Sequence, residues 1–131
     1  MVSITLDKTS TIYYHRHPGI QKLRKLEEKG KVRLYHFINM DKELENMNKH
    51  EIRSYEKLRA KIFGMKDDIT IAQHANLCLL AKHKTAKRDF FLSLDRDNLL
   101  REENRNFLEK MGIRIREPSK AFLDEIKPMI K

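Results

Sequence analysis

The chain has 131 residues, within the usual range for one domain, so we expect a single folding unit over residues 1–131. Apolar residues make up 40% and charged residues 36%, and the few glycines and prolines exclude a disordered or linker-rich protein. The net charge of +9 favours a polyanionic partner, most commonly nucleic acid, although many basic proteins bind no polyanion.

The cysteine count and the hydropathy of the chain restrict the cellular compartment in which we expect the protein. The one cysteine, Cys78, excludes an internal disulfide and a cysteine-based zinc site, and its apolar surroundings predict a buried, inert thiol. The first residues become charged too early for a signal peptide, and no run of eighteen apolar residues exists to span a membrane. We therefore expect a cytoplasmic protein with no membrane partner.

The first third of the chain predicts two strands around a helix. Residues 2–6 (VSITL) are β-branched and apolar and stop at Asp7, which indicates a short buried strand. Ser10 or Thr11 can begin a helix that continues through Pro18 and ends at Gly30. Residues 32–38 (VRLYHFI) predict the second strand.

The middle of the chain predicts helices. Apolar positions between 41 and 63 recur with a period near 3.6, which indicates one long helix or two with a break near Asn48, ended by Gly64. Asp67 is expected to cap the next helix, which runs from Asp68 to about His83. Its sequence is apolar on nearly every side, so this helix should be the most buried one.

The last third returns to strands. Residues 89–94 predict a strand that ends at Asp95, and a helix stopped by Gly112 follows. Residues 113–115 predict a short strand, and a final helix begins at residues 118–119 and is ended by Pro128. Strands that alternate with helices indicate a three-layer α/β/α sandwich around a short parallel sheet of four or five strands. In such sheets ligands bind at the carboxyl ends of the strands.

Four acidic residues are expected near that edge, namely Asp7, Glu43, Asp68 and Asp95. Each one alone is more often a helix cap than a functional group. Four together would repel one another and raise their own pKa values unless a cation offsets the charge. Oxygen ligands favour Mg²⁺ or Mn²⁺ over zinc, so the set predicts a metal site.

Four motifs occur in order along the chain. They are an Asp two positions before a hydroxyl or Asn, a Glu-Leu pair, Asp-x-x-Ile-Ala, and Ser/Thr-x-Asp-x-Asp, found here at Asp7–Thr9, Glu43–Leu44, Asp68–Ala72 and Ser93–Asp97. This ordered set resembles the PIN domain family, and the tail at residues 112–123 also looks like the last strand and the proline-led helix of that family. Lys8-Thr9 and Ser93 depart from the commoner Thr-Asn and Thr, but a hydroxyl remains at both places.

The resemblance implies a Mg²⁺- or Mn²⁺-dependent nuclease that hydrolyses phosphodiester bonds, usually in RNA. Asp7 and Asp95 would be the primary metal ligands, and Glu43 and Asp68 would complete the cage. Glu45, Asp41 and Asp67 compete for the second and third acidic positions. Side chains that would hydrogen-bond the ligands or metal-bound water are those of Thr9, Ser93 and Asp97. Basic residues expected to contact phosphate are Arg16, Lys42 and Arg96.

Several functions remain open at this level. The active nuclease could be the toxin of a toxin–antitoxin pair (VapC-like), with an antitoxin as partner, or an RNA-processing enzyme, and a homodimer is compatible with both. The alternative is a non-catalytic RNA-binding PIN module. A response-regulator receiver is disfavoured because Lys8 and Thr9 stand where that class needs an acidic pair. His74, in the buried helix, is expected to be a hydrogen-bonded core histidine rather than a ligand.

Overall fold

The computed structural model describes residues 1–8, 10, 16–35, 47–64 and 68–130 and contains an α/β fold with a four-stranded, all-parallel sheet. β1 (Val2–Leu6) lies between β2 (Val32–Tyr35) and β3 (Phe90–Leu92), and β4 (Ile115–Arg116) pairs with β3. The predicted parallel sheet is confirmed, although β3 and β4 are shorter than expected or displaced by a residue or two. The end of the second predicted strand, from residue 36 on, lies outside the described residues.

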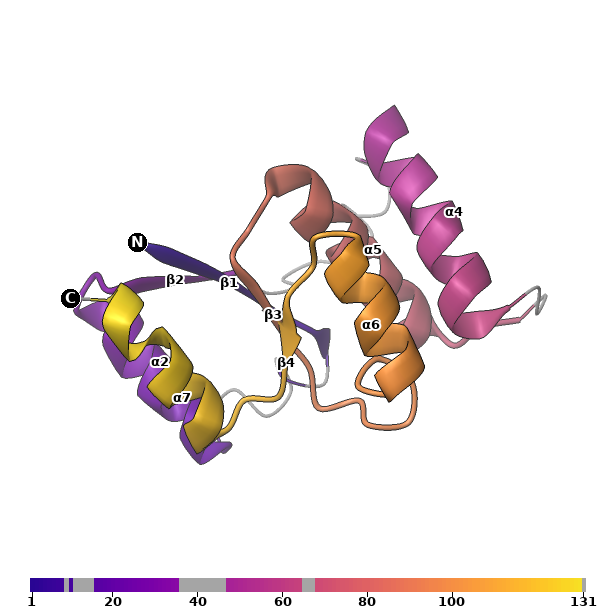
Figure 1. The fold of residues 1–131 in the computed structure, drawn as a ribbon. Helices are drawn as coiled ribbons and strands as arrows, with labels where there is room; N and C mark the ends of the chain where they lie inside the picture. Colours follow the sequence, from indigo (N-terminus) through magenta and orange to yellow (C-terminus); the bar gives the residue numbers. More distant parts are fainter. Residues whose placement is uncertain (9, 11–15, 36–46, 65–67, 131) are drawn as a thin grey trace.

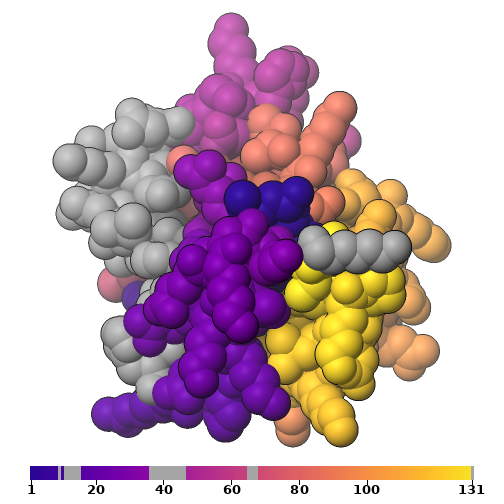
Figure 2. All heavy atoms as spheres, turned by 90° about the vertical axis from the view of Figure 1, so that its left-hand side faces the viewer, coloured from indigo at the N-terminus to yellow at the C-terminus, as the bar shows by residue number. Residues whose placement is uncertain are grey.

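Helices cover both faces of the sheet, so the predicted three-layer arrangement is confirmed (Figure 1). One face carries α2 (Pro18–Glu28) and α7 (Lys120–Ile126), which is followed by the short 3-10 helix η1 (Lys127–Met129). These two helices lie side by side on the surface seen in Figure 2, α2 in violet and α7 in yellow. The other face carries α4 (Lys49–Phe63), α5 (Ile71–Ala86) and α6 (Glu102–Lys110).

The central strand β3 is apolar on both faces because both of its faces are covered. In β3, Phe90 and Leu92 belong to the core beneath α2 and α7, whereas Phe91 belongs to the core beneath the other helices. Phe90 packs edge-on against Phe122 of α7, with 5.1 Å between ring centroids. α5 is the most buried of the described helices, as predicted, and Cys78 lies in its buried part as a thiol without a disulfide.

The start of α5 differs from the prediction. We expected Asp67 to cap a helix beginning at Asp68, but the helix begins at Ile71. Thr70 is its N-cap: the Gln73 backbone N–H donates to Thr70 Oγ1 at 3.1 Å, and Gln73 Oε1 accepts from the Thr70 N–H at 2.9 Å. This reciprocal pair satisfies two backbone donors that Asp68 would have left unpaired, so the prediction of Asp68 in the first turn is wrong.

The expected break near Asn48 is the start of α4, because the Asn48 side chain accepts the Glu51 backbone N–H at 2.9 Å. The helix ends at Gly64, whose φ of 69° is the left-handed conformation that favours glycine. The part of the predicted helix between residues 41 and 46 lies outside the described residues.

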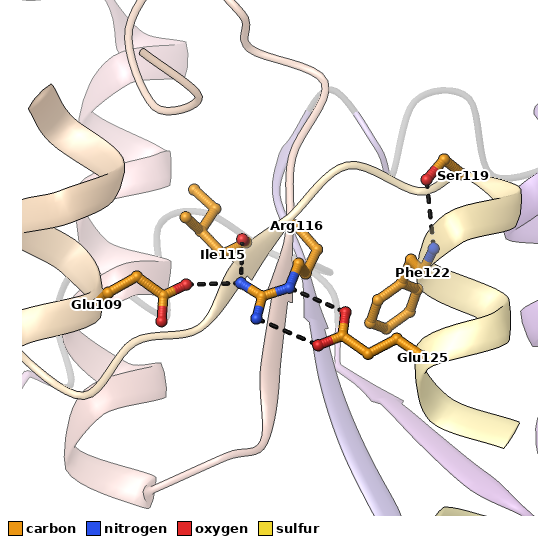
Figure 3. Close-up of polar contacts among 6 residues, drawn as sticks. All are labelled: Glu109, Ile115, Arg116, Ser119, Phe122 and Glu125. Carbon is orange, nitrogen blue, oxygen red and sulfur yellow. Dashed lines mark hydrogen bonds and ion pairs between the residues drawn. The ribbon is translucent and has the colours of Figure 1, made fainter. Parts of the chain in front are cut away.

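Arg116, at the end of the edge strand β4, forms ion pairs with a helix from each of the two helical layers (Figure 3). Nη1 of Arg116 donates to Glu109 of α6 at 2.6 Å, and its Nε donates to Glu125 of α7 at 2.9 Å. The hydrogen bond to Glu125 is the main reason that the pKa of Arg116 is raised. Bidentate arginine–carboxylate pairs of this kind hold their geometry better than single surface ion pairs do.

Candidate active site

Asp7 stands immediately after β1 and is fully buried. Its backbone N–H donates to the carbonyl of Leu92 at 3.0 Å, which extends the pairing of β1 with β3 by one residue. Its Oδ1 accepts the Ser10 backbone N–H at 2.7 Å, the bond that an N-cap side chain makes with a helical turn. Its Oδ2 accepts the Ser93 hydroxyl at 2.6 Å, which capping does not explain.

Ser93 connects Asp7 to Asp95. Its hydroxyl donates to Asp7 and accepts the Asp95 backbone N–H at 3.0 Å. The Ser93 backbone N–H donates to the carbonyl of Arg116 at 3.0 Å, so the residue is fixed to β4 as well. The buried Ser93 thereby orients the Asp7 carboxylate and the start of the loop that carries Asp95.

Asp95 lies beyond the end of β3 and is partly buried. Its Oδ1 accepts the Asn98 backbone N–H at 3.1 Å, and its carbonyl accepts the N–H of Leu100 at 2.9 Å. These two bonds fold residues 95–100 into turns and are those of a structural cap. The two acids therefore end adjacent parallel strands at the same edge of the sheet.

The electrostatics of the pair follow from this placement. Burial is the main cause that raises the pKa of Asp7, and the negative charge of Asp95 raises that pKa a little further. The hydrogen bonds from Ser93 and Ser10 act in the opposite direction and lower the pKa of Asp7. A cation bound beside the two carboxylates would also favour the charged form of Asp7.

The structure describes only some of the other predicted site residues, and those that it describes are exposed. Asp68 is exposed and lies two residues before the cap of α5. Asp97 is exposed in the turn after Asp95, and Arg16 is exposed just before α2. Arg96 is exposed and forms an ion pair with Glu117 at 2.5 Å. The predictions for Glu43, Thr9 and Lys42, like the competing choices Glu45, Asp41 and Asp67, lie outside the described residues.

Within the described residues, no three His, Cys, Asp or Glu side chains come together as a group that could hold a metal ion. The structure brings Asp7 and Asp95 to one edge, and it does not add Asp68 to them. Two carboxylates are nevertheless a sufficient protein contribution for Mg²⁺, which commonly keeps several water ligands and takes one or two carboxylates.

Ser10 and Asn76 support the site, although the sequence analysis did not assign either residue to it. Ser10, considered only as the start of a helix, is buried and supplies the backbone N–H that holds Asp7 Oδ1. Asn76 is a buried amide of α5, and its Oδ1 accepts the Lys8 backbone N–H at 3.0 Å, which positions the chain directly after Asp7. The sequence signal for this role was the amide side chain of Asn76 within an otherwise apolar run of α5.

His74 is hydrogen-bonded as predicted, but it is only partly buried and does not belong to the core. Its Nδ1 bonds to the hydroxyl of Tyr55 from α4, and its Nε2 lies 3.9 Å from Sγ of Cys78. Burial is the main cause that lowers the pKa of His74. These contacts join α4 to α5 and give His74 a structural role.

The fold and the site define a class: an α/β protein with a parallel sheet and, at the carboxyl edge of its central strands, a buried Asp7 whose carboxylate is linked through the Ser93 hydroxyl to the backbone of the partly buried Asp95. Comparisons with models of known protein families, with curated proteins and with solved structures gave no match to this chain. In the described part of the chain, no helix is long and apolar enough to cross a membrane.

Proposed function

We propose that this protein is a Mg²⁺- or Mn²⁺-dependent nuclease that hydrolyses phosphodiester bonds in RNA. The observation that carries the proposal is the hydrogen-bonded link from the buried Asp7 carboxylate through the Ser93 hydroxyl to the backbone N–H of Asp95, which fixes the two acids at the carboxyl edge of β1 and β3. A helix cap requires only one carboxylate oxygen, and it requires neither burial nor a second acid on the neighbouring strand. Ligand sites of open α/β sheets lie at this edge.

The donor set is suited to a hard divalent cation. Asp7 and Asp95 contribute carboxylate oxygens, and the described part of the site has no thiolate or imidazole that would favour zinc. The Ser93 hydroxyl holds Asp7 in orientation, as the hydrogen-bond partner of a metal ligand does. In the proposed site, Glu43 and Asp68 remain the candidates for further ligands, directly or through water.

Each residue of this chain would have a defined task. When bound, the metal would supply a water of lowered pKa and would neutralise charge on the phosphate oxygens. Asp7 and Asp95 would bind and orient the cation, and Ser93, Ser10 and Asn76 would keep the Asp7 segment in place. Thr9 and Asp97 stay candidates for bonds to ligands or water, and Arg16, Lys42 and Arg96 for phosphate contacts.

RNA is the proposed substrate because the net charge of +9 suits a polyanion and because the motifs resemble the PIN family. The toxin role with an antitoxin partner, the RNA-processing role, the homodimer and the cytoplasmic location belong to this proposal. A non-catalytic RNA-binding module is the second candidate. It is favoured by one observation, that no three potential ligands group together within the described residues.

Cleavage of a mixed-sequence RNA tests the proposal. The wild type should cleave with Mn²⁺ or Mg²⁺ and not with EDTA. Asp7→Asn keeps the size of the side chain and should lower the rate about 100-fold or more, because a buried metal ligand is lost. Ser93→Ala should lower the rate by about 10- to 100-fold through the orientation of Asp7.

Asp124→Asn is the matched control, since it removes the same charge from an exposed position of α7 and should leave the rate unchanged. Cleavage that persists in Asp7→Asn, or in EDTA, would contradict the assignment of the site. RNA binding without cleavage under any metal would select the non-catalytic module.

A further inference from the structure

A second charged surface lies at the other end of the sheet. Two hollows of about 400 and 350 Å³ adjoin there and share Lys84 and Lys87. We call this surface the basic face. Its cationic lining comes from α4, from the end of α5 and from the residue before β4, and consists of Arg53, Lys57, Lys84, Lys87, Arg88 and Arg114.

The basic face is separated from the aspartate pair by the length of the strands. Asp89 and Arg114, which line it, immediately precede β3 and β4, whereas Asp7 and Asp95 follow β1 and β3. In a parallel sheet these positions are opposite edges. The backbone positions of Arg88 and Arg114 therefore lie at the sheet edge opposite Asp7 and Asp95, and the Arg88 side chain reaches back to Thr5.

The lining carries little opposing charge. Six Lys and Arg side chains line the two hollows, against the single carboxylate of Asp89. That carboxylate is already engaged, because its Oδ2 accepts the Ser3 backbone N–H at 2.9 Å and the Ser3 hydroxyl at 3.1 Å. Within the described residues, no ion pair includes Lys57, Lys84 or Arg114. The face thus keeps a positive potential open to solvent.

One cation of the face is fixed in place. The guanidinium of Arg88 lies 3.9 Å from the ring centroid of Tyr35, and its Nη1 donates to Thr5 Oγ1 at 3.3 Å. Arg33 lies on the same ring at 5.3 Å. A stacked guanidinium loses less conformational entropy when it binds a phosphate than a mobile lysine does.

We propose that the basic face binds the sugar–phosphate backbone of a nucleic-acid strand, independently of the aspartate pair. Hollows whose described lining residues are mostly Lys and Arg suit phosphate oxygens rather than an apolar protein segment. The binding is expected to be insensitive to sequence, because backbone contacts read no base edges. Binding at the basic face extends the interaction with RNA beyond the proposed cleavage site. This proposal does not depend on whether the protein cleaves RNA.

The test measures binding of a fluorescent, mixed-sequence 20-nucleotide single-stranded RNA in EDTA, so that cleavage plays no part. The variant combines Lys57→Gln, Lys84→Gln and Arg114→Gln, which span both hollows. It should raise Kd about tenfold or more at 50 mM salt. The slope of log K against log salt should become shallower by about 2, because each lost phosphate contact contributes about 0.7.

A matched control removes the same charge from the opposite face. Lys22 and Lys25 on α2 and Lys29 at its C-cap are exposed and line a groove of about 330 Å³ with an apolar floor, on the side shown in Figure 2. Changing all three to Gln should leave the Kd within about twofold. Circular dichroism and the melting temperature show whether both variants are folded.

Equal losses in the two variants would mean that net charge alone drives binding, and this would overturn the proposal. Unchanged binding in the basic-face variant, or no binding by the wild type at low salt, would overturn it as well. An acidic peptide of equal charge is added as a competitor. If it binds more tightly than RNA and depends on the same three residues, the face belongs to a protein partner instead.

Discussion

His83 provides a test of the structure that does not depend on the proposed function. The side chain lies in the last turn of α5, fully buried, with Nδ1 2.8 Å from Thr5 Oγ1 and its ring edge-on to Phe91. Thr5 Oγ1 also accepts a hydrogen bond from Arg88 Nη1 at 3.3 Å. The second ring nitrogen of His83, Nε2, is buried and has no hydrogen-bond partner in the described structure.

This environment opposes a charged imidazole. Burial, followed by the nearby charge of Arg88, lowers the pKa of His83 to about 4, and the charge of Asp89 offsets a small part of this. In the unfolded chain the pKa returns to its ordinary value of about 6.5. Between these two values the unfolded chain binds a proton that the folded protein does not, so stability falls as the pH falls.

The magnitude follows from the shift. Each pKa unit corresponds to about 1.36 kcal/mol, so the loss between pH 6.5 and pH 4 amounts to about 3 kcal/mol. That is a large share of the roughly 5–15 kcal/mol by which domains are stable. The stabilisation is complete above pH 6.5 and is lost progressively below it.

The perturbation is His83→Asn, which keeps an acceptor near Thr5 and removes the titrating group. Urea unfolding followed by circular dichroism between pH 7.5 and pH 4.5 gives the free energy of unfolding of both proteins. At pH 7.5 the variant should be less stable by about 1–3 kcal/mol, because part of a buried ring is missing. The difference in the free energy of unfolding between wild type and variant should be about 2 kcal/mol smaller at pH 4.5 than at pH 7.5.

Groups other than His83 titrate in both proteins, so their contributions cancel in this difference. A difference that stays constant over the whole range would refute the reasoning. NMR titration of the imidazole carbons gives an independent measurement, and a midpoint near pH 6.5 for His83 would show that the ring is hydrated and not buried as described.

Two further predictions concern the metal site and the packing of the first helix. Mn²⁺ at a hundred times its Kd should stabilise the wild type by about 2.7 kcal/mol, on the order of 10 °C in Tm for a domain of this size. Asp95→Asn should remove most of that gain in a thermal-shift assay without lowering the metal-free Tm, because Asn still caps the turn at Asn98. Gly19→Ala would place a Cβ 2.7 Å from the carbonyl oxygen of Pro118, so urea unfolding should show a loss of about 1–3 kcal/mol.

Much of the fold could be predicted because it depends on local patterns. The apolar run VSITL becomes β1 as predicted, and it ends at Asp7 because a charge follows five residues suited to a buried strand. Gly30 was expected to stop a helix, and its φ of 73° shows why a residue without a Cβ is suited to that position. The alternation of strands and helices was sufficient to predict the parallel sheet.

The start of α5 shows that two capping candidates can compete in one sequence. Thr70 and Gln73 form a capping box that is visible in the sequence as Thr-x-x-Gln. The choice of Asp67 as the cap placed the helix start three residues too early. The local signal was correct because it satisfies backbone donors, whereas an exposed Asp68 satisfies none that the structure describes.

The contacts that make the site could not be derived from local patterns. Asp7 and Ser93 are 86 residues apart in the sequence, and the hydrogen bond between them exists only because β1 and β3 are neighbours in the sheet. Periodicity predicts which residues form strands, but it does not give the strand order or the register. The pairing of Thr5 with His83 is long-range in the same way.

α5 connects the two surfaces of the molecule, and its dipole is aligned with their charges. Asn76, in its N-terminal half, contacts the chain behind Asp7, and seven residues later, about 10 Å along the axis, His83 contacts Thr5. The positive end of the helix dipole therefore points towards the aspartate edge, and the negative end towards the basic face.

Helix stability alone could account for Lys84, in the last turn of α5, at about 0.3–1 kcal/mol. It cannot account for Lys57 and Arg114, which come from α4 and the loop before β4 and meet Lys84 only around the two hollows. Helix stability does not explain why cations from three elements gather around the same two hollows, whereas a phosphate backbone bound there would explain it.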